Sequence, residues 1–170
     1  MRFAKFLKAA AFALPLALAG KAAQSADVID VALSSDSHKT LVAAVQAAGL
    51  VSTLQGPGPF TVFAPTDEAF AALPPGTVEE LLKPENKDKL TAILTYHVVP
   101  GKTMAQQIKG KQFYAKTVQG QPVFIEGVSN TKIFVSPNPT NNVTNKAHVL
   151  AQVPTGNGVV HVIDKVLLPQ

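Results

Sequence analysis

Four histidines are the side chains of this 170-residue chain best suited to bind a metal or to transfer a proton. They are His38, His97, His148 and His161, and no two have the close spacing that brings paired imidazoles onto one metal ion. His97 and His161 each lie within a run of apolar residues, where histidines are usually buried and hydrogen-bonded. We therefore expect both rings to be structural groups, and we expect no metal site and no cofactor.

Other catalytic patterns are weak as well. The chain has no cysteine and no G-x-S-x-G nucleophile motif. The acidic pairs Asp67-Glu68 and Glu79-Glu80 have the positions of helix-start charges, and Gly56 to Gly58 is not followed by the lysine of a phosphate-binding loop. The sequence therefore predicts a protein that is not an enzyme.

The first 26 residues have the composition of a secretory signal peptide. Three basic residues precede an apolar run from Ala9 to Ala19, and small residues follow it. The run is shorter than the roughly 20 apolar residues that a membrane-spanning helix needs. We predict that residues 1–26 are a leader cleaved after Ala22, Ser25 or Ala26. The remaining chain would then be secreted, periplasmic or at the cell surface, with no integral membrane span.

Removal of the leader would leave 11 lysines against 11 acidic residues, because four of the 15 basic residues, including the only arginine, lie in it. A nearly neutral chain without arginine is a poor binder of nucleic acid and of phosphate groups. Such a chain is also expected to lack a strong field that would steer a partner. We therefore expect no nucleic-acid partner, and recognition through local shape and hydrogen bonding.

One stretch, Gly58 to Phe70, encodes a strand followed by a helix. Its residues Phe60 to Ala64 are rich in aromatic and β-branched types and alternate in size, which predicts a strand. Pro65 should end that strand, because proline cannot donate to a ladder. Thr66 has the chemistry of a helix N-cap, and Asp67 places a carboxylate in the first turn.

Helical patterns dominate the first half of the chain and strand patterns the second. Helices are predicted over Asp27–Leu33, over Thr40–Ala48 with Gly49 as the stop, after a Thr77/Glu80 capping box, from Pro84 to His97, and over Thr103–Ile108. Strands are predicted over Phe113–Val118, Pro122–Val128, Lys132–Ser136, Ala147–Val153 and Val159–Leu167, with a polar loop over Pro137–Asn145. This order indicates an α+β fold in one domain over residues 27–170.

Three stretches resemble, in the expected order, the signatures of the fasciclin domain. They read FTVFAPTDEAF, YHVVPG and NGVVHVID. The resemblance is carried by Phe60, Thr61, Phe63, Ala64, Pro65, Thr66, Asp67 and Phe70, by Tyr96 and His97, and by Asn157, Gly158, His161 and Asp164. It spans residues 28–168 and implies a wedge-shaped β-sandwich of about seven strands, with helices from the N-terminal half packed on it.

The resemblance also implies a function. It suggests an exported, non-catalytic interaction module that mediates cell adhesion, through contact between cells, with matrix or with a host surface. The partner would be a cell-surface or matrix protein or a polysaccharide, and we expect the chain to be a monomer. The alternative is a periplasmic or extracellular binding protein for a small molecule or a polysaccharide, which an apolar pocket with converging polar groups would favour.

Two places are candidates for contact with a partner. Tyr96 and His97 supply a hydroxyl and an imidazole that could share a buried polar network. The resemblance implies that this pair supports folding and, in some animal members, also contributes to cell binding. The second place is the loop Pro137–Asn145, with the polar residues Asn138, Thr140, Asn141 and Asn142. Loops of this kind carry function or act as solvated connectors, and both readings stay open.

The chain departs from the integrin-binding animal members at one point. In those members an aspartate–isoleucine pair precedes the C-terminal signature. The matching positions here are Gln152 and Val153, so the acidic side chain that could complete an integrin metal site is missing. We do not expect integrin binding by that route.

Overall fold

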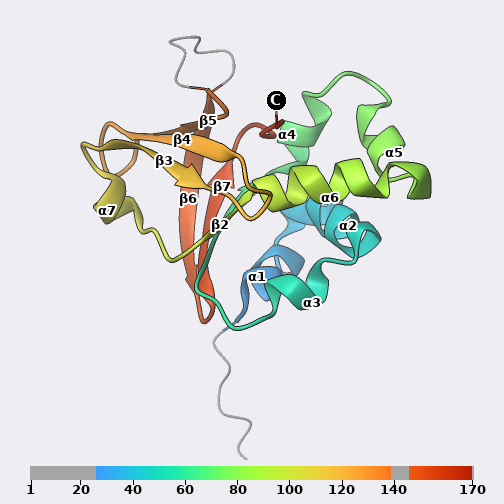
Figure 1. The fold of residues 1–170 in the computed structure, drawn as a ribbon, viewed down its shortest axis with the longest axis horizontal. Coiled ribbons are helices and arrows are strands. Elements are labelled where there is room, and N and C mark those ends of the chain that lie inside the picture. The colour runs from blue at the N-terminus through green and yellow to red at the C-terminus, as the bar shows by residue number, and fades with distance from the viewer. Residues whose placement is uncertain (1–25, 139–145, 170) are drawn as a thin grey trace, which may run out of the picture.

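The computed structural model describes residues 26–138 and 146–169. The helices other than α7 gather on one side of it, and the strands lie on the other side together with α7 (Figure 1). The helical elements are α1 (Val28–Leu33), η1 (Asp36–His38), α2 (Lys39–Ala48), α3 (Val51–Leu54), α4 (Asp67–Ala71), α5 (Thr77–Leu81), η2 (Pro84–Asn86), α6 (Lys87–Tyr96) and α7 (Ala105–Ile108). The strands are β1 (Phe60–Pro65), β2 (Val98–Pro100), β3 (Gln112–Lys116), β4 (Pro122–Gly127), β5 (Ile133–Ser136), β6 (Ala147–Thr155) and β7 (Gly158–Ile163).

The stretch that encodes strand, cap and helix folds as predicted. Phe60–Pro65 is β1, and the Thr66 hydroxyl caps α4 by accepting a hydrogen bond from the Ala69 N–H. Asp67 and Glu68 lie in the first turn of α4, where carboxylates favour the positive end of the helix dipole. The sequence was therefore sufficient to predict the whole transition from β1 to α4.

The seven strands follow the order β2-β1-β7-β6-β5-β4-β3. β1 pairs in parallel with β7, and the other pairs are antiparallel. The register shifts at Val149 and Ala151 of β6, and such a bulge bends a sheet. The two ends of the sheet approach each other, since the Val118 N–H donates to the Val98 carbonyl at 2.8 Å. The result is the predicted α+β fasciclin fold, a seven-stranded sheet close to a barrel with helices packed on it.

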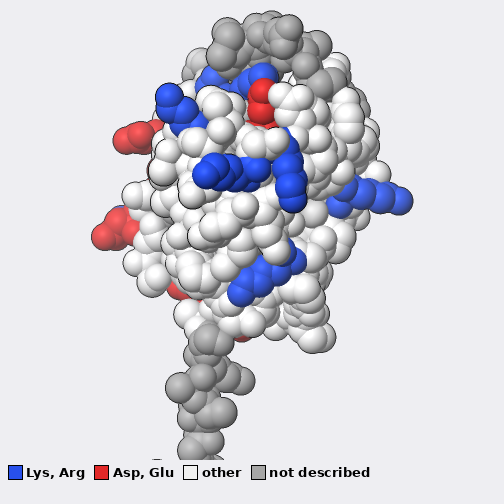
Figure 2. Space-filling view, turned by 90° about the vertical axis from the view of Figure 1, so that its left-hand side faces the viewer, with Lys and Arg blue, Asp and Glu red and all other residues white. Residues whose placement is uncertain are grey.

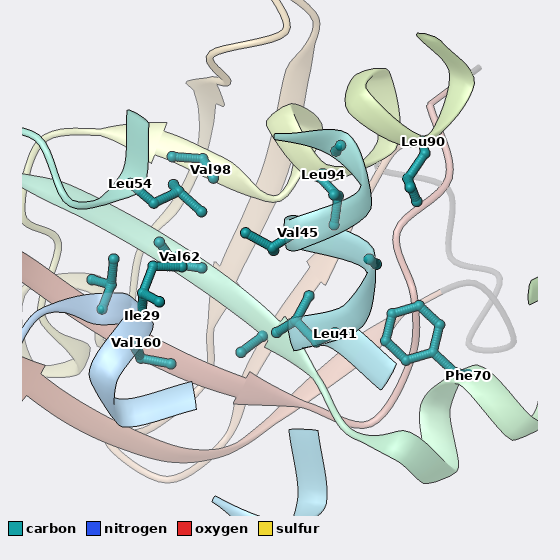
Figure 3. Close-up of a cluster of buried hydrophobic side chains, with 14 residues drawn as sticks. Ile29, Leu41, Val45, Leu54, Val62, Phe70, Leu90, Leu94, Val98 and Val160 are labelled. Atoms are coloured by element: carbon teal, nitrogen blue, oxygen red, sulfur yellow. The ribbon is translucent and has the colours of Figure 1, made fainter. Parts of the chain in front are cut away.

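Apolar side chains form two layers of core. The inner layer fills the space enclosed by the sheet, and among its members are Phe63, Tyr96, Ile108, Val123, Ile125, Ile133, Val135, Val149 and Ile163. The second layer lies between the helices and the outer side of β1, β2 and β7. Figure 3 shows Leu41 and Val45 of α2 pointing toward Val62 of β1. The alternation of β1 thus directs Phe63 inward and Val62 toward the helices.

Several local predictions were wrong, each for a physical reason. Residues 51–54 form α3, although no helix was predicted there. Thr77 is the first residue of α5 rather than its cap, because Gly76 takes the N-cap position at a φ of 87°. The last strand stops at Ile163 instead of Leu167, because the following residues leave the sheet to contact α6.

Candidate interaction site

The three signature stretches lie side by side in space. β1 is flanked by β2, which follows the tyrosine–histidine pair, and by β7, which belongs to the C-terminal signature. Val62 is the point where they meet, because it is opposite Val98 on one side and Val160 on the other. The three signature stretches therefore form adjacent strands at one end of the strand order.

Thr61 links the first signature to the third. Its hydroxyl donates to the Gly101 carbonyl at 2.6 Å and accepts from the Thr103 N–H at 2.9 Å. The Thr103 carbonyl in turn accepts from Nε2 of His161 at 2.8 Å. Thr103 is thus held in place by a buried threonine on one side and presents its carbonyl to a buried histidine on the other.

His161 is fully buried, as the sequence predicted. Its ring stacks on Phe63 with 5.5 Å between the ring centroids. Because Nε2 faces a carbonyl, Nε2 carries the proton, and Nδ1 has no partner among the described residues. Burial lowers the pKa of His161, so the ring is neutral at physiological pH.

His97 joins α6 to the C-terminal segment. Its Nε2 accepts from the Leu167 N–H at 2.9 Å, which leaves the ring proton on Nδ1, where it is donated to the Ile93 carbonyl at 2.7 Å. Burial lowers the pKa of His97 to about 4. The imidazole therefore acts as a neutral connector between elements far apart in the sequence.

Tyr96 is turned away from His97, so the two side chains do not form the shared network that the sequence suggested. The Tyr96 hydroxyl donates to the Pro122 carbonyl at 3.2 Å. Burial raises the pKa of this phenol. Tyr96 is 1% exposed and His97 is 2% exposed, so in this conformation both support the fold. A contact of either residue with a partner stays a prediction.

Other motif residues join helices and strands that are distant in the sequence. The Asn157 amide accepts from the Val28 N–H at 3.1 Å and donates to the Leu54 carbonyl at 2.8 Å, so it ties α1 and α3 to the β6–β7 turn. The Asp164 carboxylate accepts from the His148 N–H at 2.7 Å. Gly158 passes so close to the Phe60 carbonyl that any Cβ would collide with it.

Asp67 has a role that its position in α4 did not reveal. Its carboxylate accepts from the Thr40 N–H at 2.8 Å and from the Lys39 N–H at 3.3 Å, and thereby caps α2. Partial burial opposes ionisation, but these hydrogen bonds hold the pKa of Asp67 below its ordinary value. Gln152 serves α7 in the same way, because its Oε1 accepts from the Ala105 N–H at 2.6 Å. These contacts join residues that are far apart in the sequence, so no local sequence pattern indicates them.

The candidate loop is only partly within the described residues. Asn138 is exposed, and its carbonyl accepts from the Ser136 hydroxyl at 2.8 Å. Thr140, Asn141 and Asn142 lie outside the described residues. Their role in binding stays a prediction.

An apolar cavity of about 60 Å³ lies between the helices and the sheet. Ile29, Leu54 and Val160 are among the side chains that line it, from α1, α3 and β7 (Figure 3). Its polar lining is limited to Gln46 and His97, and the ring nitrogens of His97 are already bonded. For comparison, an apolar cavity that binds benzene measures about 150 Å³.

Among residues 26–138 and 146–169, no group of three or more histidine, cysteine, aspartate or glutamate side chains is arranged to hold a metal ion. One Ser-x-x-Lys spacing is present at Ser129 and Lys132. There the serine hydroxyl accepts from the Lys132 N–H at 3.1 Å and so belongs to the β4–β5 turn. No helix in the described part of the chain is both long and apolar enough to cross a bilayer.

Comparison with known proteins agrees with this geometry. The model of the fasciclin domain matches residues 36–169. Protein sll1483 of Synechocystis is 51% identical over 143 residues, which are 84% of this chain and 73% of that protein. Immunogenic protein MPB70 of Mycobacterium bovis is 36% identical over 165 residues, which are 94% of this chain and 78% of that protein.

Longer proteins contain the same unit. Transforming growth factor-beta-induced protein ig-h3 of Sus scrofa is 38% identical over 143 residues, which are 84% of this chain and only 19% of that protein. Among solved structures, a FAS1 domain pair from the insect cell adhesion molecule Fasciclin I superposes with a TM-score of 0.70 at 16% identity. That match covers 82% of this chain, which spans half the length of the matched pair.

Proposed function

The chain belongs to the fasciclin domain family, and we propose that it is an exported, non-catalytic module that mediates cell adhesion. The observation that carries the proposal is the shared fold with a FAS1 pair of a cell adhesion molecule. Fold alone does not fix function, so the adhesive role is argued by analogy. The buried, hydrogen-bonded state of His97 and His161 supports a non-catalytic role, because neither ring is accessible to a substrate.

The proposed partner is a cell-surface or matrix molecule, and the proposed location is outside the cytoplasm. The N-terminal composition supports export, because basic residues, an apolar run and small residues follow one another as in a signal peptide. We further propose that the protein acts as a monomer.

Deletion of the gene, scored for cell aggregation and attachment to surfaces, tests the adhesive role. Adhesion should fall in the deletion strain and should recover when purified protein is added to the medium. Recovery by added protein separates an extracellular role from a role inside the cell. Unchanged aggregation and attachment in the deletion strain would refute the proposal.

A small-molecule binding protein is the second class of function that the sequence allowed. The apolar cavity is the feature that would favour it, but at about 60 Å³ it is far below the roughly 300 Å³ at which pockets for drug-sized ligands begin. Of the two polar residues that line it, His97 has both ring nitrogens already bonded. The structure therefore supports surface recognition over an enclosed small-molecule site.

A further inference from the structure

The charges of residues 27–170 are segregated between two halves, although they cancel over this range. Residues 27–96 contain nine acidic residues and four lysines, a net charge of −5. Residues 97–170 contain seven lysines and two acidic residues, a net charge of +5. The first set builds most of the helical side and the second most of the strands (Figure 1). Neutrality over residues 27–170 is therefore compatible with local fields of either sign.

Three of these seven lysines, Lys116, Lys132 and Lys146, lie on the outer side of β3 to β6. Side chains alternate along a strand, and Val123, Ile125, Ile133 and Val135 point inward to the core. Among the intervening positions, which point outward, are Tyr114 and Lys116 of β3, Phe124 and Glu126 of β4, Lys132 and Phe134 at β5, and Lys146 and His148 at β6. We call these eight residues the basic sheet face. Figure 2 looks toward this side and shows lysines spread over a surface with little acidic area.

The single carboxylate of the basic sheet face is already engaged. Glu126 accepts from Lys146 Nζ at 2.7 Å and from Gln112 Nε2 at 2.7 Å. Within the described part of the chain, the recorded ion pairs involve neither Lys116 nor Lys132, and both are exposed. Their charge is thus available to a partner.

Aromatic rings lie between these lysines. Tyr114 is 56% exposed and contacts Phe124 across the strand pair, with 5.2 Å between the ring centroids. Phe134 contacts His148 at the same separation. Four strands at about 4.8 Å spacing make a face roughly 15 Å wide, which suits an extended chain better than a single small ligand.

We propose that the basic sheet face binds an acidic polysaccharide, a polymer whose sugar rings carry carboxylate or sulfate groups. The inference rests on the proposed adhesive function and names the chemistry of its partner. Lysines would pair with the acidic groups, and the ring of Tyr114 would pack on the C–H face of a sugar, since aromatic rings offer large amphipathic contact area. Each lysine carries its charge at the end of a flexible side chain, which suits a polymer whose acidic groups are irregularly placed.

Other polyanions fit this face less well. Nucleic acids and phosphates are usually held by the bidentate fork of arginine, and residues 27–170 contain none. Peripheral membrane binding favours an amphipathic helix with a wide apolar side, whereas this face is a sheet with alternating lysines and rings. A second copy of this chain could bind through its acidic helical side, but that surface has no sugar rings that would pack on the exposed ring of Tyr114.

The test measures binding of the purified protein to immobilised alginate, a polymer of uronic acids, in calcium-free buffer at 50 and 300 mM NaCl. Dextran is the neutral comparison polymer. Lys116→Glu/Lys132→Glu alters the face, and Lys83→Glu/Lys89→Glu makes the same change of net charge at exposed lysines of the helical side. Tyr114→Ala removes the aromatic contact. Circular dichroism verifies that every variant folds.

We expect alginate to bind and dextran not to bind, with weaker binding at the higher salt concentration. The face variant should bind roughly tenfold or more weakly, because two charges that attract the polymer become charges that repel it. The helical-side variant should stay within about twofold of wild type, since exposed charges beyond a Debye length of about 10 Å are screened. Tyr114→Ala should weaken binding by roughly two- to tenfold at both salt concentrations.

Three results would overturn the inference: no binding to alginate, equal loss in both double variants, or equally tight binding to poly(dT) or to phosphatidylglycerol vesicles. Self-association that is lost in the face variant would also overturn it, because a second copy would then occupy the face. Cell attachment is scored in parallel. Attachment without alginate binding would refute this inference and leave the adhesive function standing, whereas alginate binding without attachment would do the reverse.

Discussion

Lowering the pH from 7 to 5 should destabilise the protein through His97. The neutral ring matches its site, because Nδ1 donates to Ile93 and Nε2 accepts from the Leu167 N–H. A second proton on Nε2 would face that N–H and would place a charge in the core. The folded pKa is about 4, below the ordinary value of 6.5, so the unfolded chain binds more protons in this range.

The magnitude follows from the two pKa values. A difference of about 2.5 units corresponds to about 3.4 kcal/mol when the ring is protonated in both states. This stability is complete above the unfolded pKa near 6.5 and is lost as the pH falls toward about 4. By pH 5 about 2 kcal/mol should be gone, while most carboxyl groups are still ionised. Burial also lowers the pKa values of His38 and His161, so their contributions have the same sign.

Urea unfolding followed by circular dichroism at pH 7, 6 and 5 measures this effect. His97→Gln should be less stable at pH 7, and its further loss down to pH 5 should be about 2 kcal/mol smaller than that of wild type. His148→Gln is the matched control, because His148 lies half-buried on the outside of β6. The reasoning is refuted if His97→Gln keeps the full pH dependence of the wild-type protein.

Four further predictions concern the leader, the core, a cap and the loop. N-terminal sequencing of secreted protein should find a start between Ala23 and Asp27, and an intact Met1 would contradict export by cleavage. His161→Ala should lower the free energy of unfolding by about 1–3 kcal/mol, because it leaves a cavity and an unpaired Thr103 carbonyl; an unchanged thermal midpoint would contradict this. Asp67→Ala should cost about 1 kcal/mol through the lost cap of α2, whereas the exposed Glu68→Ala should cost little. Replacement of residues 138–145 by a short Gly/Ser linker should preserve the circular dichroism spectrum but reduce cell attachment, and full attachment would rule the loop out.

Local chemistry made much of the fold predictable. Thr66 caps α4, and Gly49 ends α2 at a φ of 73°. The strands of the second half were found within a few residues of their observed bounds, because their inward and outward side chains alternate. In each case the signal lies within a few neighbouring residues.

The features that were missed depend on contacts between distant segments. The parallel pairing of β1 with β7 joins residues about 100 positions apart, and nothing local encodes it. The place of Asp67 in the first turn of α4 was enough to explain its carboxylate. Its hydrogen bonds to the backbone of α2 were therefore not predicted. Leu167 was predicted to lie in a strand because its neighbours are apolar, but its N–H donates to Nε2 of His97. A polar atom 70 residues away thus decided where β7 ends.

The same distinction bears on where recognition occurs. The signature stretches contribute the adjacent strands β1, β2 and β7, and Thr61, His97 and His161 use their polar atoms on backbone groups of the protein itself. Side chains so engaged build the fold and have little left to offer a partner. The outward side chains of β3 to β6 are not needed to build the core, because the inward side chains of these strands fill it. Those outward residues can therefore vary without loss of the core, and here they combine lysines with aromatic rings.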